Sequence, residues 1–440
     1  MPSYGPEILG PPPRDPEQKF WDPEIQTMDP ERLADLQLER LKTLVGKVFD
    51  TPVAFFERKL REGGINSAKD IKSLDDLSSV PLTVKQELRD AEAEHPPFGD
   101  YRFTDARRAV RIGTSTGTTG TPTISFWTRR DLWIEYESSA RNWWRTGYRP
   151  GMIITHAHPA YLYSGGPMLS GSYEYFGMLN VWVPPPDTDE LAEQGLRFWL
   201  RVKPDVPFQG FTTGRFLEVA GKLGIDPKDA GLEFRMPPGF GMGKGMPLMT
   251  AGAECYAYLG SGCGQLPGAH LAQDWSVVQA VDPETGRDVP DGEWGDLVVT
   301  TLDRDNGFIR YDLEEACAII REPCVCGETS IRGLWGGRFK DLIATQGTRF
   351  QATEVESALR SVPAVARPTV EWQMIRPTDD AKPLRVRVER GSEAPADKNE
   401  IADSCRDAIK QRLGIEADVE VLDRETIPRS GYKAARVIDG

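Results

Sequence analysis

The hydrophobic and polar positions of the chain change their period three times along its length. Residues 29–50 carry apolar side chains at helical spacing behind an Asp-Pro pair, which predicts a helix. Residues 51–62 predict a second helix, and residues 80–93 predict a short strand end followed by a helix that Thr83 caps. We expect the proline-rich residues 1–20 to form an extended arm on the surface.

Between residues 107 and 204 apolar strands alternate with helices. Residues 107–137 read as strand, Gly/Ser/Thr-rich loop, strand and helix. Strands are predicted at 152–159 and 179–186, and an amphipathic helix at 190–204. This alternation is typical of an α/β architecture.

The pattern is different again from residue 274 onward. Residues 274–312 contain β-branched runs separated by Pro-Glu-Thr-Gly and Pro-Asp-Gly turns, which predicts a β meander or small barrel. Beyond residue 343 we expect helices at 353–365 and 396–414 and strands at 384–390 and 417–423. The sequence therefore predicts a large α/β domain over 1–339 and a small α+β domain over 340–440, with the boundary near Lys340.

Composition excludes several classes of protein. Of the 440 residues, 39% are hydrophobic and 27% are charged, which is ordinary for a globular protein. The net charge of −14 argues against a nucleic acid or an anionic membrane as partner, because both select a basic face. No apolar run reaches the length of a membrane span, and the first residues lack the order of a signal peptide. We therefore expect a cytoplasmic protein whose six cysteines are not a disulfide framework.

The most specific motif is the loop at 114–123, where consecutive hydroxyl residues are interleaved with glycine. Backbone N–H and hydroxyl groups in such a loop can converge on one anion. The loop lacks the Lys-Ser/Thr of a Walker A motif, and a plain flexible loop is the alternative interpretation. The candidate phosphate-binding residues are Ser115, Thr116, Gly117, Thr118, Thr119 and Gly120.

Three later motifs carry charges at the ends of elements. In residues 308–315 a carboxylate at a strand end could accept the hydroxyls of a ribose. Residues 337–341 surround a glycine at the domain boundary and could form a hinge. Residues 428–433 place a lysine on a glycine-containing loop, which suits phosphate or carboxylate oxygens. Taken singly, the first is better explained as a solvated acidic turn and the second as a linker with ordinary charges. For the third, a frayed basic tail is the alternative.

Soft metal ligands are scattered over the second half of the chain. Zn²⁺ favours four Cys or His ligands, although isolated cysteines are more often simply buried. The candidates are Cys255, Cys263, His270, Cys324 and Cys326. Cys317 and Cys405 lie on apolar faces and are expected in the core. His156 and His158 point to the same side of a predicted strand, where they could bind metal, line a pocket or make structural hydrogen bonds.

In this order the motifs resemble the adenylate-forming superfamily of acyl-CoA synthetases, and most closely the phenylacetate–CoA ligase family. The resemblance runs from about residue 20 to the C-terminus and rests on STGTTGTPT, VDPETGRDVPDGEWGDLVVTTL, IRYDL, CVCGETS, GRFKDLI and IPRSGYKAARVID. It implies a large N-terminal domain and a small mobile C-terminal lid, with the active site between them.

The resemblance also implies a reaction in two halves. A carboxylate attacks the α-phosphate of ATP to give an acyl-adenylate, and a thiol such as coenzyme A then displaces AMP. When the roles of the family's residues are transferred to the matching positions of this sequence, Ser115 to Thr119 hold the outer phosphates of ATP and Lys433 bridges the carboxylate and the α-phosphate. Arg338 then contacts the ribose or a phosphate, and Lys340 is the hinge of the lid. The implied cofactors are ATP, Mg²⁺, coenzyme A and a structural zinc ion.

The resemblance assigns the zinc to Cys263, His270, Cys324 and Cys326, with Cys255 as a substitute for Cys263. Three features depart from the family pattern, and one is that residues 431–433 read Gly-Tyr-Lys where the family usually has Gly directly before Lys. Glu315 stands where the family has its ribose-binding Asp. Residues 259–263 are the best match to the family's Tyr-Gly-x-Ser/Thr-Glu motif and lack both its aromatic residue and its Glu.

We expect the acid to bind between the strand at 152–159 and loops at 161–176 and 236–245. Aromatic and Met-rich walls suit an aryl ring, although the same side chains could be ordinary core. The predicted acid-binding residues are His156, His158, Tyr161, Tyr163, Gly165 and Gly166, with Tyr173, Tyr175, Phe176, Phe240 and Met242 nearby.

The main hypothesis is therefore an ATP-dependent ligase that activates a benzoate- or phenylacetate-type acid and transfers it to coenzyme A. One alternative is a diverged adenylating enzyme that passes the acyl group to an amine, a hydroxyl or a carrier-protein thiol. A non-catalytic binder of an aryl acid or nucleotide is the other. The expected partners are the acid and ATP or AMP, with a homodimer possible.

Overall fold

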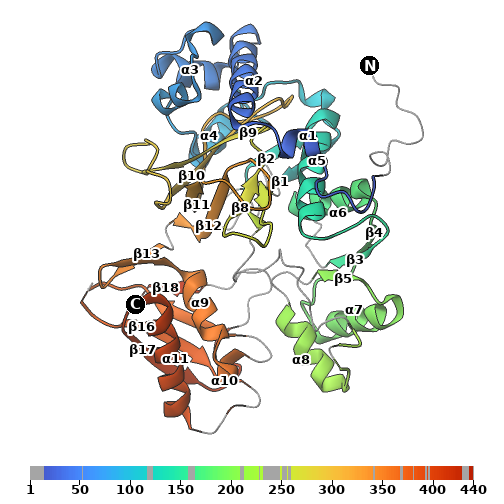
Figure 1. Ribbon diagram of the computed structural model, residues 1–440, viewed down its shortest axis with the longest axis vertical. Coiled ribbons are helices and arrows are strands. Elements are labelled where there is room, and N and C mark those ends of the chain that lie inside the picture. Colours follow the sequence, from blue (N-terminus) through green and yellow to red (C-terminus); the bar gives the residue numbers. More distant parts are fainter. Residues whose placement is uncertain are drawn as a thin grey trace. The chain divides into compact units, whose positions relative to one another are not determined.

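The computed structural model describes most of the chain (Figure 1). The described residues are 14–51, 53–115, 122–156, 164–208, 213–226, 228–230, 248–249, 255, 259–339, 342–366, 370–379, 381–391, 394, 397–428 and 436–439. Among the described helices, none has both the length and the apolar character that crossing a membrane requires.

The chain divides into two compact units. The first comprises Met1–Met152, Pro159–Asn180 and Met236–Trp335, and the second comprises Ile153–His158, Val181–Arg235 and Gly336–Gly440. The sequence did not suggest that residues 153–158 and 181–235 group with the C-terminal part. The predicted boundary at Lys340 stays a prediction, because that residue lies outside the described ranges.

The first unit begins with a helical layer. Its helices are α1 Pro23–Gln26, α2 Pro30–Asp50, α3 Ala54–Glu62 and α4 Lys85–Glu94, with 3₁₀ turns at Ala68–Asp70, Leu74–Ser79 and Ala106–Arg108. The prediction of α2 is confirmed: Asp29 caps it, and Leu41, Val45 and Val48 are fully buried on its inner face. Thr83 does not cap α4 as predicted. Its hydroxyl donates to the carbonyl of Ile309, and the Glu87 carboxylate instead accepts from the Val84 N–H that begins the helix.

A seven-stranded sheet supports this layer, and the three strands at one edge of it form the predicted meander. The strands are β6 Leu248–Met249, β7 Gly260–Ser261, β8 Ala269–Leu271, β9 Ser276–Val281, β10 Gly295–Thr301, β11 Tyr311–Ile320 and β12 Arg332–Arg338, in the order β6-β7-β8-β12-β11-β10-β9. β10 pairs antiparallel with both β9 and β11. β9 and β10 are buried along their whole length, so the sheet lies in the core of the unit.

A hairpin and two helices complete the first unit. They are β1 Arg111–Thr114, β2 Ile124–Trp127, α5 Arg129–Arg145 and α6 Gly165–Phe176. Thr128 and Asp131 form a capping box at the start of α5. The prediction of loop for residues 161–176 is wrong over α6. Most of its side chains are buried, so the segment has no polar face from which a helical period could be recognised.

The second unit contains a small α/β part. Its three-stranded sheet has the order β4-β3-β5, from β3 Ile153–His156, β4 Leu179–Trp182 and β5 Val206–Phe208, and β3 and β5 are parallel. Helices α7 Asp189–Val202 and α8 Thr213–Leu223 share an apolar cluster around Trp199 and Phe216.

The C-terminal part of this unit is the predicted α+β fold. It comprises β13 Leu342–Thr345, β14 Thr348–Gln351, α9 Ala352–Arg360, α10 Pro363–Ala366, β15 Trp372–Ile375, β16 Leu384–Glu389, α11 Lys398–Leu413, β17 Ala417–Leu422 and β18 Val437–Ile438. Four of these strands form one sheet in the order β17-β16-β15-β18. Among the described residues, the buried members of its apolar core run from Ile343 to Val421, and Val437 packs against them.

Candidate active site and metal centre

The predicted phosphate loop connects β1 to β2, and its stem is well defined. Thr114 pairs with Ile124 at the end of the hairpin. One step closer to the tip, the Ser115 N–H donates to the Thr123 carbonyl at 3.1 Å, and the Thr123 N–H donates to Ser115 Oγ at 3.1 Å. Ser115 is therefore buried at the base of the loop. Thr116, Gly117, Thr118, Thr119 and Gly120 lie outside the described residues.

The N-terminus of α6 is bonded to the same stem. The backbone N–H and the hydroxyl of Ser164 both reach the Thr114 carbonyl, at 3.1 and 3.2 Å. Gly165 and Gly166 form the buried first turn of α6. Free N–H groups at a helix N-terminus favour a negative charge. The hairpin stem and the positive end of α6 thus lie together.

Glu315 lies on β11, where the Trp335 indole Nε1 donates to its Oε2 at 2.6 Å. A neutral donor of this kind fixes the orientation of the carboxylate. Arg338 is the last residue of β12 and is half-buried. Lys340 and Lys433 lie outside the described residues.

Among the predicted acid-binding residues, His156 is fully buried at the end of β3. Its ring centre lies 4.8 Å from that of Trp182 on β4. His158, Tyr161 and Tyr163 lie outside the described residues, as do Phe240 and Met242.

Aromatic residues of α6 belong to the core, the alternative that the sequence left open. Tyr173 and Phe176 are almost completely buried, with ring centres 5.0 Å from Trp143 and 5.2 Å from Trp21 respectively. The Tyr175 hydroxyl donates to the Glu137 carboxylate.

The four residues assigned to zinc converge on one point. One potential ligand atom from each of Cys263, His270, Cys324 and Cys326 lies within 4.8 Å of all the others. Cys263 Sγ is 3.5 Å from Cys324 Sγ, and Cys326 Sγ is 3.3 Å from His270 Nε2. Thiolates on one tetrahedral zinc ion are about 3.8 Å apart, so the arrangement fits such an ion.

Cys255 is buried in the main core and is not a member of this group. Cys317 and Cys405 are buried core residues, as predicted. Within the described part of the chain, no other group of three or more Cys, His, Asp and Glu side chains is placed to hold a metal ion.

Hydrogen bonds within the group shift the pKa values of two of its thiols. The hydrogen bond from Cys326 lowers the pKa of Cys263 well below its usual range. The same contact with Cys263 raises the pKa of Cys326 above its usual range. The direction of the shift at Cys263 favours the thiolate, which is the form of cysteine that binds zinc.

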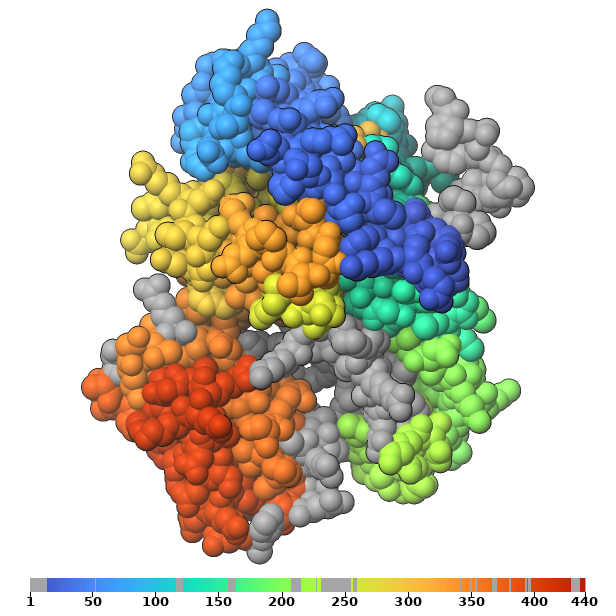
Figure 2. All heavy atoms as spheres, viewed as in Figure 1, coloured from blue at the N-terminus to red at the C-terminus, as the bar shows by residue number. Residues whose placement is uncertain are grey.

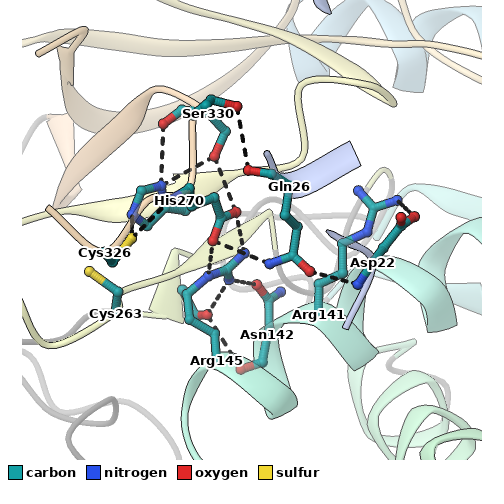
Figure 3. A network of polar contacts seen from close by, with 12 residues as sticks. Asp22, Gln26, Arg141, Asn142, Arg145, Cys263, His270, Cys326 and Ser330 are labelled. Carbon is teal, nitrogen blue, oxygen red and sulfur yellow. Dashed lines mark hydrogen bonds and ion pairs between the residues drawn. The ribbon is translucent and has the colours of Figure 1, made fainter. Parts of the chain in front are cut away.

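His270 is held in the orientation that a metal ligand needs (Figure 3). Its Nδ1 lies 3.2 Å from the carbonyl oxygen of Ser330, while Nε2 faces the Cys326 sulfur. A carbonyl only accepts hydrogen bonds, so Nδ1 carries the proton and the lone pair of Nε2 points into the group.

Sequence reasoning missed the polar residues around this group. The Glu328 carboxylate pairs with Arg145, and Ser330 joins Glu328 to His270. Position 328 follows Cys326-Gly327 directly, which marks it as part of the same turn. No sequence signal marked Arg145, which lies 183 residues away on α5.

Comparison with known proteins gives consistent matches. Residues 347–440 match the AMP-binding enzyme C-terminal domain family. A phenylacetate–coenzyme A ligase of Thermus thermophilus is 31% identical over 461 residues, which cover 96% of this chain and 99% of that protein. The phenylacetate–coenzyme A ligases of Aromatoleum evansii and Escherichia coli are 27% and 26% identical, over 94% of this chain and 96% of theirs.

Solved structures show the same fold. A 2-hydroxyisobutyryl-CoA ligase in the postadenylation state, in complex with 2-HIB-AMP, superposes with a TM-score of 0.82 at 23% identity, covering 99% of this chain and 95% of that one. The same enzyme with 2-HIB-AMP and CoA in the thioesterification state gives a TM-score of 0.66. The predicted α/β fold class is confirmed.

Proposed function

This chain belongs to the phenylacetate–coenzyme A ligase family of adenylate-forming enzymes, and from that premise we propose that it joins an aryl carboxylic acid to coenzyme A at the expense of ATP. The acid's carboxylate oxygen attacks the α-phosphorus of ATP, and pyrophosphate leaves. The sulfur of coenzyme A then attacks the acyl carbon, and AMP leaves. Such chemistry needs charge neutralisation at the phosphates and exclusion of water from the mixed anhydride.

The observation that carries the proposal is the joining of the β1–β2 stem to the N-terminus of α6. Ser164 bonds to Thr114, so the loop that begins at Ser115 starts beside free N–H groups of a twelve-residue helix. We propose that residues 115–120 hold the β- and γ-phosphates of ATP there. Hydroxyl and backbone N–H donors suit these oxygens, and the helix end favours their charge.

The remaining roles are proposed position by position. Glu315, oriented by Trp335, accepts the ribose hydroxyls. Arg338 contacts the ribose or a phosphate, and Lys433 neutralises the charge that develops between the attacking carboxylate and the α-phosphate. Lys340 acts as the hinge of the C-terminal lid. Mg²⁺ is held mainly by the phosphates and water, as this ion usually is.

We further propose that the cysteine–histidine group holds one structural Zn²⁺. Cys263, Cys324 and Cys326 would supply thiolates and His270 its Nε2. Four protein ligands leave no open position, so the ion would stabilise the fold rather than bind substrate.

The acid is proposed to be of the benzoate or phenylacetate type. Two features support an aromatic acid: the names of the curated relatives, and the pairing of His156 with Trp182, whose side chain is 39% exposed. An exposed indole beside an imidazole suits a flat ring better than an alkyl chain. His158, Tyr161, Tyr163, Gly165 and Gly166 are proposed to complete this pocket.

The test is ATP–pyrophosphate exchange measured against substituted benzoates, phenylacetates and short fatty acids, for the wild type and for Lys433→Ala. We expect exchange with the aryl acids and a loss of at least 10³-fold in the variant, because a transition-state charge loses its partner. Lys382→Ala is the control, since Lys382 is an exposed lysine of the same C-terminal part that pairs with Asp379. Near-normal exchange in Lys433→Ala would refute the role of that residue, and exchange with fatty acids alone would refute the aryl acid.

A further inference from the structure

Glu328 is a buried carboxylate beside the cysteine–histidine group, and it belongs to none of the roles above. Its two oxygens accept two hydrogen bonds from Arg145, Oε2 from Nε at 2.8 Å and Oε1 from Nη2 at 2.7 Å. Both side chains are less than 10% exposed. A buried two-point ion pair of this kind fixes direction as well as position.

One face of this pair orients the proposed metal ligands (Figure 3). The Ser330 hydroxyl donates to Glu328 Oε1 at 3.2 Å, and the Ser330 carbonyl and hydroxyl oxygens each lie 3.2 Å from His270 Nδ1. The Glu328 N–H donates to the Cys326 sulfur at 3.4 Å. Glu328 therefore contacts both a proposed ligand and the residue that sets the tautomer of another.

The other face of the pair holds the N-terminal segment. Gln26 Nε2 donates to Glu328 Oε2 at 3.2 Å. The neighbouring Thr329 donates its N–H to the Gln26 carbonyl at 3.0 Å and its hydroxyl to the Met28 carbonyl at 2.6 Å. In Figure 2 the N-terminal residues, in dark blue, lie against the yellow and orange residues of the sheet.

The start of the segment is bonded to the helix that carries Arg145. Asp22 pairs with Arg141 of α5 at 3.3 Å, and Trp21 donates from its indole to Glu137 of α5 at 2.9 Å. Residues 22–28 thus connect α5 to the turn that holds two of the proposed ligands.

Residues of the N-terminal segment, of α5 and of the metal group line a small cavity of about 20 Å³, among them Gln26, Arg145 and His270. It has room for about one water molecule. Loss of residues 22–28 from this position would open the Nδ1 side of His270 to solvent.

We propose that Glu328 and Arg145 are positioning residues of the metal centre, and that docking of residues 22–28 retains the metal through them. The inference rests on the metal proposed above. Because coupling between two events is reciprocal, a bound metal must also hold the segment in place.

The first test measures the rate of zinc release to a colorimetric chelator from the full-length holoprotein. Glu328→Gln should release zinc about 10- to 100-fold faster than the wild type, the usual effect of losing a residue that orients a ligand. Glu135→Gln is the matched control. It breaks a similarly buried ion pair with Arg304 in the same unit, away from the cysteines, and should leave the release rate unchanged.

Thr329→Val tests the segment alone, because it removes the hydroxyl bond to Met28 and leaves the ligands and Glu328 in place. We expect release at least about 5-fold faster, against no change in Glu24→Gln, an exposed position of the segment. Hydrogen exchange completes the test: removal of zinc from the wild type should speed exchange of the amides over residues 22–28.

Two results would overturn the inference, and they are distinguishable. A wild type that binds no zinc refutes the metal proposal itself. A wild type that binds one zinc, with release unchanged in both Glu328→Gln and Thr329→Val and exchange over 22–28 insensitive to zinc, refutes the coupling alone.

Discussion

At the scale of single residues, Asp296 shows how strongly burial can disfavour the ionised form of a carboxyl group. It lies on β10 with 6% of its surface exposed, and its Oδ1 has no hydrogen-bond partner among the described residues. Burial, with smaller contributions from Asp312 and Glu314, raises its pKa to about 7. Asp296 thus keeps its proton in the folded chain at pH values where the unfolded chain has lost it.

Replacement of Asp296 by Asn should therefore change the pH dependence of stability. Between about pH 4 and pH 7 the folded state binds one proton more than the unfolded state. The free energy of unfolding of the wild type therefore falls by up to about 1.4 kcal/mol for each unit by which the pH rises, because of this one site. Asp296→Asn removes that slope. Urea unfolding from pH 4.5 to 8 should show that the difference in free energy of unfolding between the variant and the wild type grows in favour of the variant up to pH 7 and then levels off.

The control is Asp291→Asn, at an exposed position paired with Arg321. Parallel pH profiles for Asp296→Asn and the wild type would contradict the expectation.

Residue-scale prediction succeeded where local sequence carries the chemistry. Cys324 and Cys326 are two positions apart, so they could be recognised as a pair before any fold was known. The resemblance already preferred Cys263 to Cys255, and the structure brings Cys263, not Cys255, together with His270. Arg145 could not be found, because its role depends on a contact across 183 positions.

At the scale of elements, amphipathic segments were predicted closely. The helix expected at 190–204 is α7 at Asp189–Val202, and that expected at 396–414 is α11 at Lys398–Leu413. Both have one buried and one solvated face, which produces a visible period. The outward positions of α6 include Pro167 and Gly171, and only Glu174 among them is charged, so no polar period was visible. The loop between β1 and β2 was predicted from its glycine and hydroxyl residues, although its tip lies outside the described residues.

The strand pair β7–β8 allows an element-scale prediction. A Cβ on Gly260 would lie 2.2 Å from the backbone oxygen of His270, so Gly260→Ala must push the strands apart. We expect a loss of about 1–3 kcal/mol in the free energy of unfolding. We also expect lower zinc content, because His270 lies on β8 and Cys263 follows two residues after the end of β7.

Denaturant unfolding and metal analysis of the purified variant check this expectation. The control is Gly46→Ala in the middle of α2, where the added carbon meets only Ala68 at 3.8 Å. That substitution should stabilise the protein by up to about 1 kcal/mol, since alanine favours a helix. Equal effects of the two substitutions would contradict the steric argument.

At the scale of the whole molecule, the C-terminal part has a core of its own. Its buried members among the described residues run from 343 to 421 and include Trp372, Val355 and Ile409, all fully buried. The sequence predicted such a unit because the periodicity changes near residue 343. It could not predict the grouping of residues 153–158 and 181–235, which depends on contacts rather than on pattern.

A fragment of residues 337–440 should therefore fold alone. The only tryptophan of this fragment is Trp372. A cooperative change in the intensity or wavelength of its fluorescence during urea titration therefore reports the unfolding of the fragment. The control is Trp372→Phe, which should retain the circular dichroism transition while losing that signal. A fragment with no cooperative transition by either method would show that this core needs the rest of the chain.

The contacts between the N-terminal region and the sheet also determine when, during synthesis on the ribosome, this region can pack. Gln37 of α2 donates to the Ser276 carbonyl at 2.8 Å, 239 positions later, and Thr83 donates to the Arg310 carbonyl at 2.7 Å. At about 5–20 residues per second, the ribosome needs roughly 10–50 s to make the strands on which α2 packs. During that time the apolar face of the helix is exposed in the nascent chain, so this layer of the protein depends most on chaperones before the last strands emerge.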